Sequence, residues 1–269
     1  MIIADYHVHS HFSSDSTATM DEMIEKAVSL GLKKICFTDH MDYDFPPEYG
    51  LPFVFNPDDY FKELQEKKEK YHNKIRVLKG IELGLQPYLA NRYYDLMKAY
   101  DFDFAIGSSH LVNNVDPYQP KYWESKSEEE GIVSYFQSIT ENVKSNVDFQ
   151  VYGHLDYVVR YAPNKNQNFS YKKYSDVIDE MIKTIIHSGK GIEINTAGFK
   201  YGLGFPHPQT DILERYKELG GELITIGSDG HKPEHLGYDF PRAEQLLLSL
   251  GFNYYATFEQ KKPIFELLG

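Results

Sequence analysis

Six of the eleven histidines in this 269-residue chain share one kind of position, at or just beyond the end of a short apolar segment. They are His7, His9, His40, His110, His154 and His231. Three carboxylates follow apolar segments in a similar way, namely Asp15, Glu82 and Asp229. Imidazole and carboxylate donors without thiolate suit zinc, manganese or iron. The pattern therefore predicts a metal centre, and nine donors with one bridging carboxylate, such as Glu82, are enough for three ions.

The His7-x-His9 pair would place two ligands on the same side of an extended strand, because side chains alternate between faces. Such a pair alone is a weak signal, since this composition gives about 0.4 of them by chance. A lone histidine at a strand end is also more often a hydrogen-bonded polar residue than a ligand. The same placement recurs after successive apolar segments, and this recurrence favours metal binding.

Apolar segments of strand length alternate with amphipathic segments along the chain. Strands are predicted at residues 2–7, 34–38, 75–82, 102–108, 149–154, 191–195 and 223–228, with a weaker one at 253–257. Helices are predicted at residues 20–30, 58–71, 171–188 and 208–219, and one more from a Ser127/Glu130 capping box to about residue 144. The alternation predicts parallel strands joined by right-handed crossovers.

Seven or eight such units favour a (β/α) barrel, with an open doubly wound sheet as the alternative. No Gly-x-Gly-x-x-Gly follows the first strand, which disfavours a dinucleotide fold. In a barrel the carboxyl ends of the strands form the active-site face. Donors spread from His7 to His231 would then converge on one rim.

Composition excludes several classes of protein. The chain has 28 Lys and Arg against 40 Asp and Glu, a net charge of −12, so it lacks the basic surface typical of nucleic-acid binding. No apolar run is long enough for a membrane span. The N-terminus does not resemble a secretory signal, and the single Cys36 suits a reducing compartment. We expect a cytoplasmic protein with a small-molecule partner, no nucleic acid and no membrane.

The set of nine donors resembles the polymerase-and-histidinol-phosphatase (PHP) superfamily, from residue 5 to about residue 237. Three segments are most similar to its stand-alone histidinol-phosphate phosphatases: Asp5-Tyr6-His7-Val8-His9-Ser10, Phe37-Thr38-Asp39-His40 and Gly191-Ile192-Glu193-Ile194-Asn195-Thr196. The resemblance implies an α/β fold, a distorted seven-stranded (β/α) TIM-like barrel spanning residues 1–269 as a single domain. It implies no particular oligomeric state.

The resemblance also implies a trinuclear metal centre of divalent ions, zinc first, with iron or manganese as alternatives. Carried over by position, one ion would be held by His7, His9, Glu82 and Asp229. A second would be held by Glu82, His110 and His154, and the third by Asp15, His40 and His231.

The implied reaction is hydrolysis of L-histidinol phosphate in histidine biosynthesis, by in-line attack of a metal-bridging hydroxide on phosphorus. Arg160 is the first candidate for a phosphate clamp, because guanidinium binds phosphate as a fork, although a surface ion pair is its other interpretation. Lys200 is the second candidate; relatives often place an arginine nearby. Asp229 or a histidine of the metal site would supply the proton to the leaving alkoxide.

Three long segments, 41–56, 111–126 and 160–168, follow ligand-bearing strands and are expected to set specificity. Their carboxylates Asp42, Asp44 and Asp116 are candidates for meeting a substrate ammonium group. His235 is expected on the surface, and His207 is an open candidate for the mouth of the site.

Three other functions remain as alternatives. One is a PHP phosphoesterase acting on another phosphomonoester or a nucleotide, including a 3′–5′ exonuclease. A metal-dependent amidohydrolase also uses His-x-His, but it usually has a lysine bridge where this chain has Glu82. The last is a barrel that binds metal without catalysis, which an open rim disfavours because structural sites are normally closed.

Overall fold

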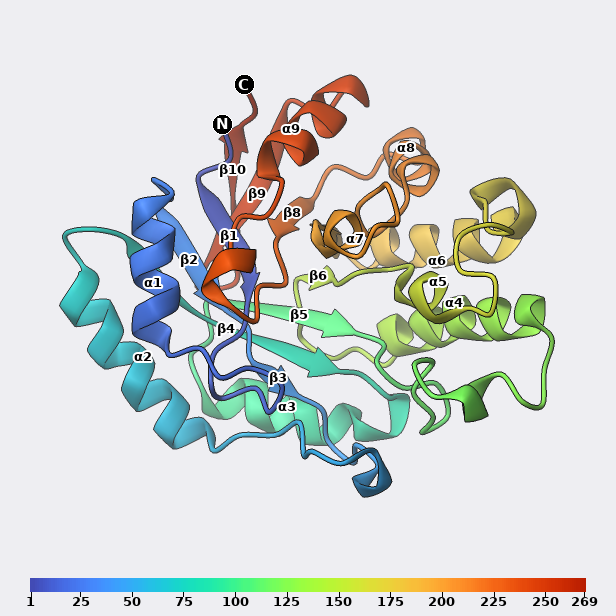
Figure 1. The fold of residues 1–269 in the computed structure, drawn as a ribbon, viewed down its shortest axis with the longest axis horizontal. Helices are drawn as coiled ribbons and strands as arrows, with labels where there is room; N and C mark the ends of the chain where they lie inside the picture. The colour runs from blue at the N-terminus through green and yellow to red at the C-terminus, as the bar shows by residue number, and fades with distance from the viewer.

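Seven parallel strands form the centre of the fold in the computed structural model, which describes residues 1–269 (Figure 1). In order around the sheet they are β1 (Ala4–Val8), β2 (Lys34–Phe37), β4 (Arg76–Gly84), β5 (Phe104–Ser108), β6 (Val151–Tyr152), β7 (Gly191–Asn195) and β8 (Ile224–Gly227). The short β3 (His40–Met41) follows β2 after a two-residue interruption and pairs with the end of β4.

The sheet curls until its first and last strands meet. Val8 forms an isolated parallel bridge with Gly230, and the His9 amide donates to the Gly230 carbonyl at 3.0 Å. The sheet is thus nearly closed, and the prediction of a distorted seven-stranded TIM-like barrel is confirmed, whereas the open-sheet alternative is wrong.

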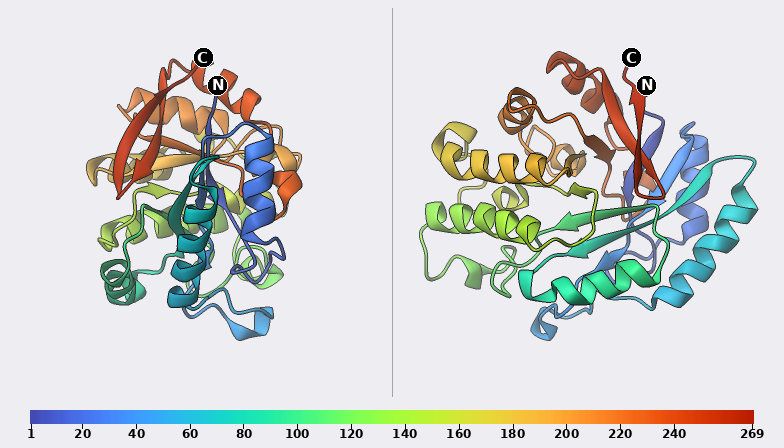
Figure 2. Two further views of the ribbon diagram at one scale, coloured as in Figure 1. Left: turned by 90° about the vertical axis from the view of Figure 1, so that its left-hand side faces the viewer. Right: turned by 180° about the vertical axis from the view of Figure 1, so that it is seen from behind.

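Helices surround the sheet on the outside (Figures 1 and 2). They are α1 (Met20–Ser29), α2 (Pro57–Tyr71), α3 (Ala90–Ala99), α4 (Glu128–Lys144), α5 (Tyr157–Tyr161), α6 (Ser175–His187), α7 (Ala197–Lys200), α8 (Thr210–Glu218) and α9 (Phe240–Ser249). Single 3₁₀ turns occur at Pro47–Tyr49, Pro87–Leu89, Pro120–Tyr122, Tyr171–Tyr174 and Pro233–His235. No helix combines the length and apolarity needed to cross a bilayer.

Local sequence explains where the main helices begin. Thr19 accepts from the Glu22 amide while the Glu22 carboxylate accepts from Thr19, and Ser127 and Glu130 form the same reciprocal cap on α4. Asn56 caps α2, whose first residue is Pro57. The predicted helix at 171–188 divides into a 3₁₀ turn and α6, because the chain turns at Tyr174.

The segment after α9 differs from the prediction of a further weak barrel strand. Residues Tyr254–Glu259 (β9) and Lys262–Leu267 (β10) form an antiparallel hairpin of their own. Gln260 and Lys261, at its tip, both have positive φ, the geometry of a two-residue hairpin turn that follows the twist of the strands.

The hairpin closes the amino-terminal end of the barrel. The Phe258 amide and carbonyl bond the Tyr6 hydroxyl at 2.9 and 2.8 Å. Phe258 and Ala256 also complete the small apolar cluster inside the barrel, which includes Tyr6, Cys36 and Phe104. The opposite, carboxyl-terminal end stays open for polar residues.

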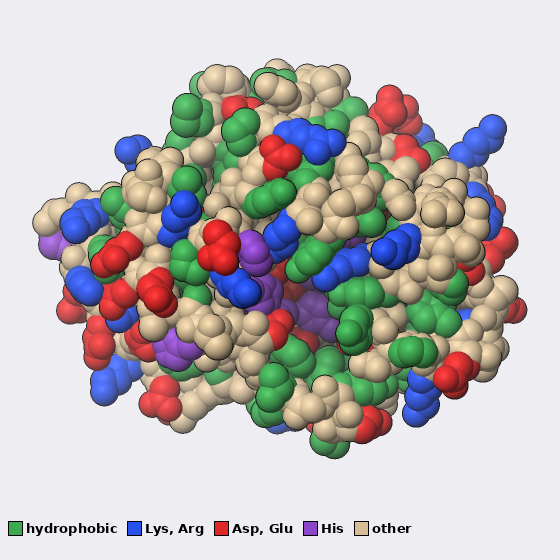
Figure 3. Space-filling view, in the orientation of Figure 1, with side chains coloured by type: hydrophobic (Ala, Val, Ile, Leu, Met, Phe, Trp, Pro, Cys, Tyr) green, Lys and Arg blue, Asp and Glu red, His purple; other side chains and the backbone are tan.

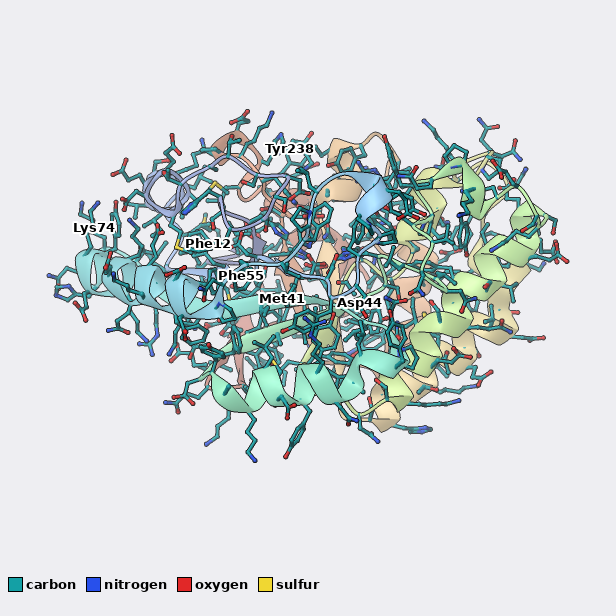
Figure 4. The ribbon with its side chains drawn as sticks, turned by 90° about the horizontal axis from the view of Figure 1, so that it is seen from below. Phe12, Met41, Asp44, Phe55, Lys74 and Tyr238 are labelled. Carbon is teal, nitrogen blue, oxygen red and sulfur yellow. The ribbon has the colours of Figure 1, made fainter.

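Aromatic packing holds the loops that cross this open end. Figure 4 labels Phe12, from the loop after β1, and Phe55, which precedes α2. The centroids of their rings lie 6.0 Å apart, and both rings contact Tyr60 of α2. The loop that carries Asp15 is therefore anchored to α2 rather than free in solvent.

Candidate metal centre

The nine predicted donors meet at the open end of the barrel, around a cavity of about 330 Å³. Figure 3 shows this site as a hollow with histidines at its floor and cationic side chains beside it. The donors lie at the ends of six strands or in the loops that follow them, and the strands bring them together because each strand ends at this rim.

Glu82, at the end of β4, occupies the middle of the cluster and is fully buried. Its Oε2 lies 3.2 Å from His7 Nε2 and 3.0 Å from His40 Nδ1. Its Oε1 lies 2.9 Å from His154 Nε2 and 3.2 Å from His110 Nε2. One carboxylate thus faces two pairs of imidazoles, which is the arrangement of a ligand that bridges two ions.

Asp229 and Asp15 complete the cluster on the side toward solvent. Asp229 Oδ1 lies 3.4 Å from His9 Nε2 and 3.4 Å from His231 Nδ1. Asp15 Oδ2 lies 3.1 Å from His231 Nε2 and 3.8 Å from His40 Nε2. Asp229 has a φ of 53°, and this turn of the chain presents both Asp229 and His231 to the same site.

Buried polar atoms without hydrogen-bond partners test whether the residues suit metal ions. His7 Nε2, His9 Nε2, His40 Nδ1, His231 Nε2 and Glu82 Oε2 are all buried and have no such partner. Buried polar atoms in native proteins are normally paired. These atoms also fall in groups spaced for coordination: His7/His9/Glu82, Glu82/His110/His154, His9/His40/His231 and His40/Asp42/His110. The site fits divalent cations.

Charge interactions in the cluster favour cations at its centre. Burial raises the pKa of Glu82, but the surrounding His7, His110 and His40 outweigh it and hold this pKa well below its usual value. Burial opposes a charge on His9 too, and with His231 and His40 beside it the pKa of His9 falls well below normal. Burial also opposes a charge on His7 and His110, but the neighbouring carboxylates outweigh it and raise the pKa of both well above normal. The carboxylates of the cluster thus favour positive charge at its centre, which bound divalent ions would supply.

A second ring of residues orients the histidines. Glu193 Oε1 lies 2.6 Å from His7 Nδ1, and Asp42 Oδ2 lies 2.7 Å from His110 Nδ1. His9 Nδ1 lies 3.0 Å from the Ser13 hydroxyl, which donates to Asp39. Sequence reasoning missed Glu193 and Asp39 as site residues. A charged side chain inside the apolar strand β7 was the available signal for Glu193.

Cationic side chains line one wall of the cavity: Arg160, Lys200, Lys232 and His235. Arg160 lies in the short helix α5 and Lys200 ends α7, so both belong to helices rather than to the loops predicted there. The expectation that His235 is an ordinary surface residue is wrong, because the turn after β8 carries it to the cavity.

Two other expectations from the sequence concern His207 and the carboxylates of the long loops. His207 does not line the cavity; it is buried, with Nδ1 2.5 Å from Asp156 Oδ1. Among the loop carboxylates, Asp116 and Asp42 face the cavity, whereas Asp44 is half exposed and pairs with Arg92 at 3.3 Å. Burial raises the pKa of Asp116 to about 6.

Comparison with known proteins agrees with this geometry. A model of the PHP domain matches residues 5–197. A histidinol-phosphatase of Lactococcus lactis is 31% identical over 264 residues, covering 96% of this chain and 95% of the relative. A Clostridium acetobutylicum protein named "Probable histidinol-phosphatase" is 34% identical over 245 residues, covering 90% and 91%.

A solved structure is similar over the whole fold. The crystal structure of the Lactococcus lactis histidinol phosphate phosphatase, complexed with Zn, L-histidinol and phosphate, superposes with a TM-score of 0.89 at 30% identity. The similarity covers 97% of this chain and 98% of that one. Family model, relatives and fold agree, and this chain belongs to the PHP domain family.

Proposed function

We propose that this chain is a cytoplasmic, metal-dependent phosphomonoesterase that hydrolyses L-histidinol phosphate to L-histidinol and phosphate, in histidine biosynthesis. Residues 1–269 act as one phosphatase domain. The observation that carries the proposal is the buried Glu82 carboxylate facing four imidazoles at the floor of an open cavity. The Lactococcus relative, whose structure holds Zn, L-histidinol and phosphate, supports the choice of substrate.

The cluster would hold three divalent ions, with zinc favoured and iron or manganese as alternatives. The ligands would be His7, His9, Glu82 and Asp229 for one ion, Glu82, His110 and His154 for a second, and Asp15, His40 and His231 for a third. Bound divalent ions would supply Lewis-acid stabilisation of the phosphoryl charge and water that is acidic near neutral pH.

Arg160 and Lys200 would bind the phosphoryl oxygens from the cavity wall. A guanidinium offers paired N–H donors that match phosphate, and an ammonium adds a compact charge. Burial lowers the pKa of the Lys200 ammonium, whose Nζ lies 3.4 Å from the Asp229 carbonyl. Lys200 therefore lies directly beside the metal cluster, and Arg160 lines the same cavity.

Asp229 would transfer a proton to the leaving alkoxide. Burial opposes its charge, but His7, His9 and His231 hold its pKa well below the usual value, so it enters the reaction as a carboxylate. One side of it faces the cavity, and Asn195 Nδ2 donates to its Oδ2 at 3.3 Å. Oδ1 faces His9 and His231 and would hold the ion, whereas Oδ2 would take the proton of the attacking water and pass it to the leaving alkoxide.

The alcohol half of the substrate would lie nearer the mouth. Phe45, Phe53, Tyr157 and Tyr161 line the cavity and would exclude water from the imidazole. Asp116, buried among them, would pair with the substrate ammonium. A net charge of −12 agrees with a small-molecule partner rather than a nucleic acid.

The test is phosphate release from L-histidinol phosphate beside a panel of other phosphomonoesters and nucleotides, on protein of measured metal content. We expect a strong preference for L-histidinol phosphate with two to three metals per chain. Glu82→Gln should abolish turnover, whereas Glu180→Gln on the exposed face of α6 should not. A flat or different profile would overturn the substrate assignment, and hydrolysis of amides instead would favour the amidohydrolase alternative.

A further inference from the structure

Arg160 differs from every other arginine of the chain in what it contacts. Four of the five arginines pair with carboxylates: Arg76 with Glu259, Arg92 with Asp44, Arg215 with Asp179 and Arg242 with Asp239. Arg92 and Arg242 also stack on rings, those of Tyr43 and Phe199. Arg160 packs against aromatic rings too, but it has no carboxylate partner and it faces the cavity. Its guanidinium is therefore positioned without a charged partner.

Tyr201 makes the closer of these aromatic contacts. The guanidinium carbon of Arg160 lies 3.2 Å from the centroid of the Tyr201 ring and 5.0 Å from that of Tyr161. A guanidinium stacked on a ring face keeps its N–H edges free for hydrogen bonds. A carboxylate partner would occupy those same donors and neutralise the charge.

Rings behind the arginine connect this contact to the floor of the site. Tyr161 packs against Tyr157 with centroids 4.9 Å apart, and Tyr157 packs against the imidazole of His154 at 5.1 Å. Tyr201 follows the last residue of α7, in the segment after β7, whereas Arg160 belongs to α5, after β6. Two barrel units thus contribute to the position of one side chain.

We propose that Tyr201 is a positioning residue for phosphate binding: its ring face holds the Arg160 guanidinium toward the cavity, in place of the carboxylate that holds each other arginine. The inference rests on the proposed role of Arg160 in phosphate binding. A free arginine side chain has several rotatable bonds, whose freedom is lost when phosphate binds. Stacking on Tyr201 removes part of that freedom in advance and lowers the cost of binding.

Lys200 depends less on Tyr201 for its position, since its Nζ lies 5.0 Å from the centroid of that ring. Its Nζ lies 3.4 Å from the Asp229 carbonyl and 3.5 Å from His235 Nδ1, so it is held against the chain segment after β8. Arg160 is the arginine that lines this cavity, and the orientation of its guanidinium depends on Tyr201.

The experiment compares Y201A, Y201F and the matched control Y94A, in which an exposed tyrosine of α3 is removed far from the cavity. For the metal-loaded protein, KM and kcat are measured with a phosphomonoester, together with the inhibition constant of inorganic phosphate. We expect Y201A to raise both KM and this inhibition constant by about tenfold, the range of a cation–π contact. Y201F should restore both constants, because the ring face is retained.

A double-mutant cycle separates positioning from general damage. If Tyr201 acts through Arg160, Y201A should change neither constant further in an R160A background. Equal losses from Y201A in the wild-type and R160A backgrounds would overturn the proposal. It would also be overturned if Y201F lost as much as Y201A, which would assign the effect to the hydroxyl.

Binding of inorganic phosphate tests the role of Tyr201 independently of which phosphomonoester the protein hydrolyses. Phosphate binding by the metal-loaded protein is measured calorimetrically, without any turnover, and the Y201A and Y201F variants are compared in the same way. If the protein prefers another phosphomonoester, the proposed function is wrong, but Y201A should still weaken phosphate binding. Unchanged phosphate binding in Y201A, with full activity on L-histidinol phosphate, would overturn the inference alone.

Discussion

Glu193 Oε1 lies 2.6 Å from Nδ1 of His7, while Nε2 of the same imidazole faces Glu82 at 3.2 Å. The other carboxyl oxygen of Glu193 accepts from the His154 amide at 3.0 Å and from Asn195 Nδ2 at 3.2 Å. One side chain of β7 thus fixes ligands that come from β1 and from the end of β6. Carboxylates that hold the far nitrogen of a metal-binding histidine also fix its tautomer.

The first prediction concerns Glu193→Gln. The substitution keeps the shape of the side chain but removes the charge that sets the His7 tautomer, so metal affinity should fall by about 10- to 100-fold. Competition with a chelator of known affinity, followed by metal analysis, measures the change. Glu180→Gln, on the exposed side of α6, is the control. Unchanged affinity in Glu193→Gln would show that the contact does not tune the site.

Metal removal gives a second prediction. Chelation should abolish phosphatase activity, and added zinc or manganese should restore it, because the donors converge on a cavity open to solvent. The far-UV circular dichroism of the metal-free protein should stay unchanged, since apolar packing on both faces of the sheet does not involve the donors. Unfolding on chelation would instead support a structural metal.

Arg160→Ala supplies a third prediction. Loss of a charge-assisted contact to phosphate should lower kcat/KM by about a hundredfold, with a melting temperature close to that of the wild type. Steady-state kinetics and thermal unfolding measure the two effects. Arg76→Ala, at the closed end of the barrel and paired with Glu259, is the matched control and should keep its kcat/KM. An unchanged kcat/KM in Arg160→Ala would remove this residue from the mechanism.

The fourth prediction is a pH dependence due to Asp116. Burial raises the pKa of this carboxyl to about 6, so it is neutral below that pH and charged above it. Binding of a substrate ammonium needs the charged form, and kcat/KM for L-histidinol phosphate should rise as the pH increases through about 6.

The substrate phosphate also titrates near pH 6, so the control is a phosphomonoester without an ammonium group. The profile for L-histidinol phosphate should be steeper on its acid side than the profile for the control ester. Asp116→Asn should raise KM for L-histidinol phosphate and make the two profiles parallel. Identical profiles in the wild type would contradict this role of Asp116.

The donors at strand ends were the predictable part of the site. Parallel strands bring their carboxyl ends to one rim whatever the details of packing, so His40, His110 and His154 could be placed from hydrophobic pattern alone. The barrel itself followed from the same alternation of strand and helix. Both predictions depend on chain order and on periodicity, which are properties of the sequence.

Three features could not be predicted in this way: the role of Glu193, the position of His235 and the β9–β10 hairpin. Glu193 is in the interior of β7, and its inward direction depends on the register of β7 against β8. His235 reaches the cavity because the chain folds back through a 3₁₀ turn at Pro233. The hairpin β9–β10 turns at Gln260 and Lys261, residues that rarely adopt positive φ, so no local signal marked it.

The β9–β10 hairpin covers the amino-terminal end of the barrel, so the site opens to solvent at the carboxyl-terminal end. Substrate enters and both products depart on the same side, because apolar side chains, Phe258 among them, fill the barrel beneath the metal cluster. If the phosphoryl group goes in first, the alcohol lies between it and solvent. The alcohol then leaves before phosphate, and phosphate is the product that competes with the next substrate molecule. With the other end of the barrel closed, the order of release follows from which half of the substrate lies deeper.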